Sequence, residues 1–134
     1  MKPRIPGSRS GHERLVRACL TYLATVLGLP TWRLNQRPVL TTKGWRNPGA
    51  DAGCPDLISL LPGIALGVEC KSGGGTLSAD QREARGRWEA AGHWWITARN
   101  AKDDLEPVAD YMKEMRRPGG PLAQSPVALL ITRR

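Results

Sequence analysis

The sequence contains few cysteines and histidines, and this excludes several kinds of small protein. The three cysteines, Cys19, Cys54 and Cys70, include no Cys-x-x-Cys pair, so neither a disulfide framework nor a zinc knuckle is indicated. The two histidines, His12 and His93, are too few and too far apart for a histidine-based metal site. Because Cys19 and Cys70 lie in apolar patterns, we expect both to be buried thiols of a protein in a reducing cytoplasm.

Long apolar runs are also absent. No apolar stretch approaches the roughly 18 residues that a membrane-spanning helix requires, so we expect no membrane partner. The basic N-terminus lacks the apolar segment of a signal peptide. The glycine run 73–75 lacks the Gly-Lys-Ser/Thr sequence of a phosphate-binding loop, and no internal repeat is visible.

Positive charge is concentrated in the first part of the chain. The 134 residues have a net charge of +8. Residues 1–54 contain nine Lys or Arg and two Asp or Glu, whereas residues 55–134 contain eleven and ten. This uneven distribution favours a polyanionic partner such as DNA or RNA. The alternative is a basic surface that only keeps the protein soluble.

The apolar pattern predicts one α/β domain over residues 1–134, with a mixed β-sheet that contains a hairpin and is flanked by helices. We expect a loose basic arm at residues 1–9 and a long, partly mobile basic loop at residues 31–54, with short strand-like pieces near Trp32–Leu34 and Pro38–Thr42. The other predicted elements are a helix from Ser10 to about Gly28, strands 57–61 and 64–70, a helix Ser78–Ala91, a strand His93–Ala98, a helix Asp104–Arg116 and an edge strand Val127–Thr132.

The predicted hairpin brings two carboxylates together. If its turn is symmetric about residues 62–63, Leu57 faces Val68 and Asp56 faces Glu69. A three-residue loop would shift this register by one. Two facing carboxylates repel each other unless one binds a proton or a cation lies between them, and Mg²⁺ or Mn²⁺ is the cation that prefers such oxygens.

A lysine is placed beside this pair. Glu69 and Lys71 are two residues apart on one strand and share a face, while Cys70 points the other way. Such a lysine can position a water or stabilise the negative charge that develops on a phosphate during hydrolysis. The alternative is an exposed Glu-Lys pair without a function.

These residues resemble the PD-(D/E)xK pattern of a nuclease superfamily. Pro55-Asp56 is followed by Glu69-Cys70-Lys71, and the surrounding run resembles the VRR-NUC family within that superfamily. The features that carry the resemblance are Gly53-Cys54-Pro55-Asp56, Glu69-Cys70-Lys71, the glycine-containing loop, Leu77-Ser78-Ala79-Asp80-Gln81 and the helix end Ala90 to His93. The match covers residues 53–98 strongly and the first helix weakly.

The resemblance implies a restriction-endonuclease-like fold and cleavage of DNA with Mg²⁺ or Mn²⁺. Asp56, Glu69 and the backbone carbonyl of Cys70 would bind the metal, and Lys71 would serve the attacking water. Gly67 and Cys70 stand where bulkier residues are frequent in the family, and neither removes a metal-binding group.

The same resemblance suggests a substrate and a setting. Stand-alone members of this size resemble phage-encoded Holliday junction resolvases that work as homodimers. We therefore expect selective cleavage of branched DNA, at a junction or a flap, in the cytoplasm of a bacterium or a phage-infected host. A nicking or restriction-type nuclease, or a DNA-binding or assembly protein with an inactive site, are the alternatives.

Two helical residues are weaker candidates for the same site. Glu13 lies near the start of the first helix, and the resemblance implies an acidic metal ligand there. Gln81 lies near the start of the second helix, where the resemblance places it beside the lysine. Each has a capping-box spacing, with Ser10 and Ser78 respectively, so helix capping is the alternative for both.

Basic and aromatic residues alternate in the long loop and are candidates for DNA contacts. A solvated loop whose tryptophans pack locally is the alternative. Asp51 in the same loop is a reserve carboxylate. The candidates are Arg33, Arg37, Lys43 and Arg46, with Trp45 and Trp32 between them.

Overall fold

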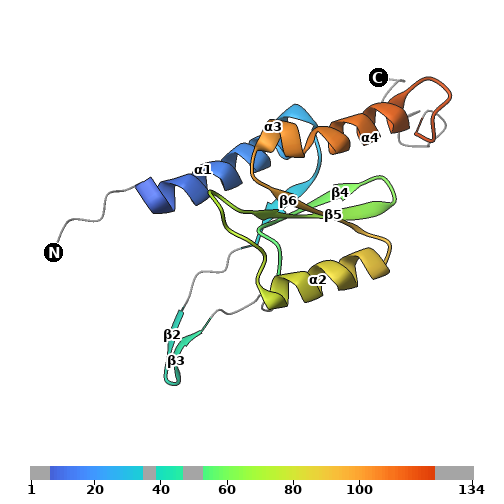
Figure 1. The fold of residues 1–134 in the computed structure, drawn as a ribbon. Coiled ribbons are helices and arrows are strands. Elements are labelled where there is room, and N and C mark those ends of the chain that lie inside the picture. Colours follow the sequence, from blue (N-terminus) through green and yellow to red (C-terminus); the bar gives the residue numbers. More distant parts are fainter. Residues whose placement is uncertain (1–6, 35–38, 47–52, 123–134) are drawn as a thin grey trace.

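The computed structural model describes residues 7–34, 39–46 and 53–122 (Figure 1). They form a mixed α/β fold with a four-stranded sheet and helices on both of its faces. The elements in chain order are α1 (Gly7–Thr21), the π-helical turn η1 (Tyr22–Val26), β1 (Thr31–Arg33), β2 (Val39–Thr41), β3 (Gly44–Arg46), β4 (Leu57–Leu61), β5 (Ile64–Cys70), α2 (Ala79–Ala90), β6 (Trp94–Ala98), α3 (Ala101–Asp104) and α4 (Glu106–Arg116).

The sheet has the strand order β1-β4-β5-β6. β4 pairs antiparallel with both β1 and β5, whereas β5 and β6 are parallel and are connected through α2. The predicted hairpin register is confirmed, because Leu57 pairs with Val68 and Leu61 with Ile64. The turn between them keeps the two strands in this register, with Gly63 in the left-handed region at φ +77°.

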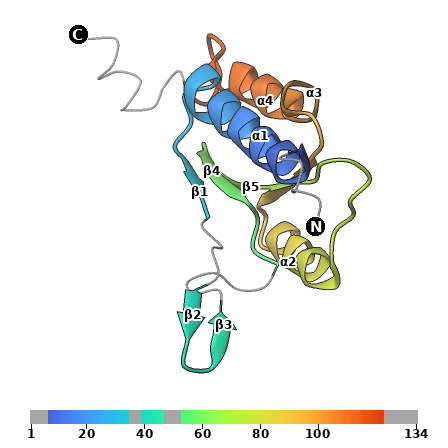
Figure 2. The same ribbon diagram turned by 90° about the vertical axis from the view of Figure 1, so that its left-hand side faces the viewer.

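The helices form two layers around the sheet. α1, α3 and α4 cover one face and α2 covers the other (Figures 1 and 2). On the first face, Val16, Cys19 and Leu23 of α1 and η1 are fully buried in the core, which also includes Leu57 and Leu66 of the hairpin. β2 and β3 form a separate two-stranded sheet that projects from this body (Figure 2).

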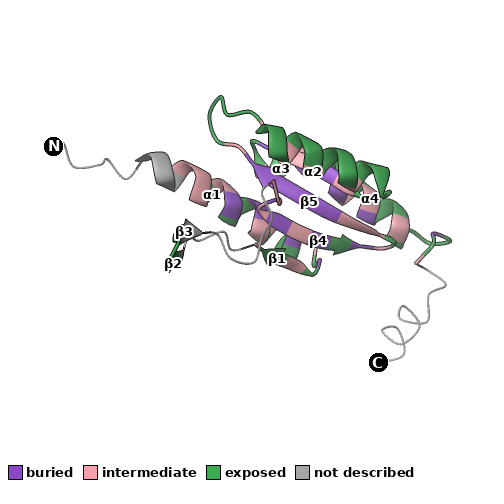
Figure 3. Cartoon of the chain, turned by 90° about the horizontal axis from the view of Figure 1, so that it is seen from below, coloured by how far each residue is buried: buried purple, intermediate pink, exposed green. Residues whose placement is uncertain are grey.

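β5 is the most buried strand, because helices cover both of its faces (Figure 3). On the α2 side, the indole of Trp88 packs over Gly67 and meets Trp95 edge-to-face at 6.0 Å. A Cβ at position 67 would lie 3.1 Å from the Trp88 ring and 3.2 Å from Pro55. Gly67 thus gives room for the tryptophan that attaches α2 to the sheet.

The predicted start of the first helix is wrong. α1 begins at Gly7, so Ser10 lies inside the helix and cannot form the predicted capping box with Glu13. Residues 7–9 of the predicted arm therefore belong to α1.

The predicted helix Asp104–Arg116 is confirmed as α4, whereas the short helix α3 before it was not predicted. α3 is capped by Asn100, whose side chain accepts a hydrogen bond from the Asp103 N–H. Pro107 lies in the first turn of α4, as predicted, and its missing N–H separates α4 from α3.

The described residues within 31–54 are more regular than predicted. β1 joins the main sheet by pairing with β4, and β2 and β3 form a hairpin of their own. The strand-like pieces near Trp32–Leu34 and Pro38–Thr42 are thus partly confirmed, whereas β3 was missed. The predicted strand Val127–Thr132 lies outside the described residues. Among the described helices, none is long and apolar enough to span a membrane.

We predict that Gly67→Ala lowers the free energy of unfolding by about 1–3 kcal/mol, because the new methyl group overpacks the contact with Trp88. Gly86→Ala is the matched control, since Gly86 lies in α2 and a methyl group there would meet no packing neighbour within 4 Å. It should raise stability by about 0.5–1 kcal/mol. Urea unfolding of both variants measures the difference, and equal effects would contradict the packing argument.

Candidate active site

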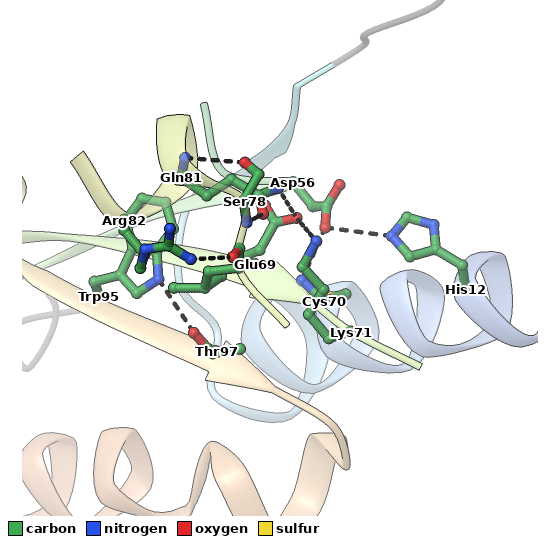
Figure 4. A network of polar contacts seen from close by, with 11 residues as sticks. His12, Asp56, Glu69, Cys70, Lys71, Ser78, Gln81, Arg82, Trp95 and Thr97 are labelled. Carbon is green, nitrogen blue, oxygen red and sulfur yellow. Dashed lines mark hydrogen bonds and ion pairs between the residues drawn. The ribbon is translucent and has the colours of Figure 1, made fainter. Parts of the chain in front are cut away.

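The carboxylates of Asp56 and Glu69 meet at one end of the hairpin, as the register predicted. Asp56 directly precedes β4, and Glu69 is the second-last residue of β5. One carboxylate oxygen of Asp56 accepts a hydrogen bond from the Cys70 backbone N–H at 2.8 Å. This bond continues the strand pairing by a side chain and fixes the Asp56 carboxylate beside Glu69 (Figure 4).

A close backbone approach positions the segment before Asp56. Gly53 has a φ of +87°, and a Cβ there would lie 2.3 Å from the Asp80 carbonyl oxygen in the first turn of α2. Only glycine fits this position without a backbone shift. Pro55, two residues later, is fully buried. The Gly-x-Pro-Asp sequence therefore connects the first carboxylate to the start of α2.

Gln81 reaches Glu69 from α2. Its side-chain N–H donates to a Glu69 carboxylate oxygen at 2.7 Å. The same amide completes a capping box, because its oxygen accepts from the Ser78 N–H at 2.9 Å and the Gln81 N–H donates to the Ser78 hydroxyl. The capping role is confirmed, and the contact with the site exists beside it.

Lys71 lies on the same side of Glu69 as predicted. Its ammonium nitrogen is 3.6 Å from the Glu69 oxygen that also accepts from Gln81. The Lys71 backbone N–H donates to the carbonyl of Ala98 at 2.9 Å, so this position is still held by β6 after β5 has ended. The lysine side chain is 21% exposed, and solvent reaches it.

Glu69 itself is in an unusual electrostatic environment. Its side chain is 5% exposed, and its second carboxylate oxygen is buried without a hydrogen-bond partner. Burial and the charge of Asp56 raise the pKa of Glu69 to about 7, although Lys71 acts in the opposite direction. An ionised carboxylate here lacks part of the stabilisation that a cation or a proton would supply.

His12 was not predicted in the site but lies in it. Its Nε2 is 3.4 Å from the Asp56 oxygen that accepts from Cys70, and the imidazole approaches from α1 (Figure 4). The apolar stripe of the first helix contained the signal. The buried residues are Val16, Cys19 and Leu23, and His12 continues that stripe one turn earlier.

Glu13 is therefore turned away from the centre of the buried stripe. Its carboxylate forms a two-point ion pair with the Arg33 guanidinium at the end of β1. This pairing lowers the pKa of Glu13. The structure does not bring Glu13 to the two central carboxylates, and its role as a metal ligand stays a prediction.

The predicted DNA-binding residues are spread over the edge of the molecule. Arg33 is engaged by Glu13, and Lys43 is exposed in the turn between β2 and β3. Trp45 and Arg46 belong to β3, which pairs with β2. Arg37 and the reserve carboxylate Asp51 lie outside the described residues. Their contacts with DNA stay predictions.

The two core cysteines lie behind the site. Cys19 and Cys70 are both free and fully buried, as expected. A hydrogen bond with Cys19 and burial raise the pKa of the Cys70 thiol. The sulfur therefore stays protonated, which leaves the Cys70 backbone carbonyl as the group considered for metal binding.

Over residues 7–34, 39–46 and 53–122, no group of three or more His, Cys, Asp or Glu side chains is arranged to hold a metal ion. The central carboxylates thus form a pair rather than a complete ligand set. Comparisons with protein-family models, characterised proteins and solved structures found no match to the chain. The geometry of the pair and the sequence pattern are the observations on which a function can be argued.

We predict that Glu69→Gln removes a pH-dependent loss of stability. The raised pKa means that the folded protein holds a proton which the unfolded chain releases above pH 4.5, so wild-type stability falls between pH 4.5 and about 7. The stability difference between Glu69→Gln and wild type should therefore grow by about 3 kcal/mol from pH 4 to pH 8.

Chemical unfolding in EDTA across this pH range measures the effect. Glu83→Gln is the matched control, because Glu83 is an exposed glutamate of α2 and should leave the pH profile unchanged. A constant difference between Glu69→Gln and wild type would show that Glu69 titrates normally.

Proposed function

We propose that this protein is an endonuclease that hydrolyses phosphodiester bonds of DNA with the help of Mg²⁺ or Mn²⁺. The observation that carries the proposal is the convergence of Asp56, Glu69 and Lys71 at one end of the β4–β5 hairpin, with a buried oxygen of Glu69 left without a partner. The resemblance of the same residues to the VRR-NUC pattern supports it, and a restriction-endonuclease-like core is part of the proposal.

The residues present fit a hard divalent cation. Asp56, Glu69 and the Cys70 carbonyl offer only oxygen atoms, and the unpartnered Glu69 oxygen is a coordination position that no protein donor fills. Mg²⁺ commonly uses one or two carboxylates and completes its shell with water and substrate phosphate, so a carboxylate pair is sufficient. When bound, the cation would polarise the phosphate and lower the pKa of a water.

The chain's own residues have separable roles in this proposal. Lys71 orients the attacking water or stabilises the charge on the phosphate. Gln81 holds Glu69 in one rotamer through its 2.7 Å hydrogen bond. The Cys70 N–H and His12 both contact one oxygen of Asp56, which fixes how its other oxygen faces the site.

The proposed substrate is DNA, with a preference for branched forms such as a Holliday junction or a flap, bound by a homodimer. The excess of basic residues in positions 1–54 supports a polyanion, and the resemblance to stand-alone junction resolvases supports the branched form. A nicking or restriction-type nuclease is the alternative within this class. The cytoplasm of a bacterium or of a phage-infected host is the setting that the same resemblance suggests.

A protein that binds DNA without cleaving it is the second candidate function. The observation that favours it is that, among the described residues, no three His, Cys, Asp or Glu side chains are arranged to hold a metal ion, although His12 lies beside Asp56. Its basic first part would still bind phosphates. Such a protein need not take up a divalent cation.

We predict that Asp56→Asn and Lys71→Met both lower the rate of DNA cleavage by at least about 100-fold, as removal of a single transition-state donor does in other hydrolases. Labelled four-way junctions, flaps and linear duplexes are incubated with Mg²⁺ or Mn²⁺ and separated on denaturing gels. Glu83→Gln should retain full activity. Equal cleavage by Asp56→Asn and wild type would point to a contaminating nuclease, and no cleavage of any substrate would favour the binding function.

Metal uptake separates the roles of the same residues. At a Mn²⁺ concentration about 100 times its Kd, binding should stabilise the wild type by about 2.7 kcal/mol, seen as a higher melting temperature. We expect Lys71→Met to keep this increase and Asp56→Asn and Glu69→Gln to lose it. An unchanged wild-type melting temperature would exclude a metal site in the folded protein.

A further inference from the structure

Two hollows lie toward the opposite end of α1 from the candidate active site. A hollow of about 420 Å³ lies between the end of α1 and α3, where Ala101 and Lys102 line its far side. A neighbouring hollow of about 340 Å³ lies between η1 and α4, where Ala109 and Met112 line the far side. Val26 lines both hollows, so they adjoin at this residue. Together they are called the groove, which lies in the layer of α1, α3 and α4.

The floor of this groove is apolar. Ala18 and Tyr22 line its first part, and Leu27 and Met112 line its second. Val26 is 66% exposed between them, one of the most exposed large hydrophobic side chains among the described residues. The groove is thus the place on the helical layer where a partner can bury apolar surface.

The charged side chains that line the rim of the groove are all basic, and one of them, Arg117, forms an ion pair with Glu114 of α4. Neither hollow is lined by an Asp or Glu. Although α4 contains Glu106, Asp110 and Glu114, none of them lines the groove. The basic residues that line it are Arg17, Lys102, Lys113, Arg116 and Arg117. The groove is therefore complementary to a partner surface in which acidic side chains flank an apolar face.

The helix geometry at this point is also irregular. The last turn of the first helix is the π-helical turn Tyr22–Val26, and the Leu27 N–H bonds to the Tyr22 carbonyl at 2.9 Å. Single π-helical turns occur frequently at functional sites, because they cost stability and place side chains outside the regular stripe. Tyr22 and Val26, the two ends of this turn, both line the groove.

The basic rim and the apolar floor distinguish between three classes of occupant: DNA, the chain's own residues 123–134 and a helix of a partner protein. DNA offers phosphates but little apolar surface to cover Val26 and Tyr22. The chain's own residues 123–134 contain two arginines and no acidic residue, so they do not complement the basic rim. An α-helix with an apolar stripe and acidic flanks satisfies both the floor and the rim, and helices bind grooves of this kind through side chains at i, i+3, i+4 and i+7.

We propose that the groove that α1 and η1 form with α3 and α4 binds an acidic amphipathic helix of a partner protein. The segment from Arg17 to Val26 spans about 14 Å along the helix axis, enough for two to three turns of such a partner. His12, the α1 residue in the candidate active site, is about 20 Å along the axis from Val26. The groove is therefore independent of the proposed cleavage reaction, and a partner bound there leaves the carboxylates accessible.

The experiment uses the full chain and a fluorescein-labelled peptide of about 18 residues, with leucines at i, i+3, i+4 and i+7 and glutamates on both flanks. A peptide of the same composition in scrambled order has the same charge without the apolar stripe. Fluorescence anisotropy should show binding of the designed peptide at least about tenfold tighter than the scrambled one. Val26→Asp should weaken it at least about tenfold, and Arg116→Glu several-fold with a smaller dependence on salt.

Matched controls exist for both variants. Leu40→Asp changes a residue with the same 66% exposure in β2, and Arg87→Glu changes a basic residue in the last turn of α2, as Arg116 is in α4. Both should bind the peptide as the wild type does, and Val26→Asp should cleave DNA at the wild-type rate. Failure of the nuclease proposal would leave these binding results unchanged.

Three outcomes would overturn the proposal. The first is equal binding of the designed and scrambled peptides, or binding that Val26→Asp does not weaken. The second is a loss of duplex DNA affinity in Val26→Asp and Arg116→Glu, which would make the groove a nucleic-acid surface. The third is a sedimentation profile in which the wild type is a dimer and Val26→Asp a monomer, which would make a second copy the occupant.

Discussion

The hydrogen bond from the Cys70 N–H to the Asp56 carboxylate joins the fold to the site, and the other features of the site depend on it. It extends the β4–β5 ladder by one step, but with a side chain in place of a carbonyl. The first carboxylate thereby acquires the rigidity of a strand although its residue lies outside one. The close contact of Gly53 with the first turn of α2 places the start of this helix beside the carboxylates. Gln81 can therefore donate its hydrogen bond to Glu69. Two carboxylates, a lysine and an amide are assembled by local geometry within residues 53–81.

The negative charges of Asp56 and Glu69 repel each other, and Lys71 offsets only part of this repulsion. Lys71 and Gln81 both contact the same oxygen of Glu69, while the other oxygen is buried without a donor. A site selected only for stability would fill that position or replace the glutamate by an apolar residue. The retained strain is a general property of functional sites, where groups are arranged for a ligand and not for the empty fold.

The features that could be predicted from sequence are those that depend on neighbouring residues. The hairpin register follows from a symmetric turn, and the cap of α2 from the spacing of Ser78 and Gln81. The features that were missed depend on contacts between distant segments. β1 joins the sheet through β4, and Glu13 pairs with Arg33, twenty residues further along the chain. Neither contact leaves a periodic pattern in the sequence. His12 was missed for a different reason: the resemblance implied an acidic residue on the first helix, and this favoured Glu13. The buried side chains are Val16, Cys19 and Leu23, and they bring the neighbouring His12 to Asp56.

The double role of Gln81 has a consequence for motion. The side-chain amide of Gln81 caps the N-terminus of α2 through Ser78 and also holds Glu69. Fraying of the first turn of the helix therefore releases the Glu69 carboxylate as well. Any ligand that binds Glu69 in the orientation held by Gln81 must, by thermodynamic reciprocity, lower the population of the opened turn. The exchange rates of the first backbone amides of α2 are therefore a reporter of occupancy at the carboxylate pair, readable in the intact protein without following a reaction.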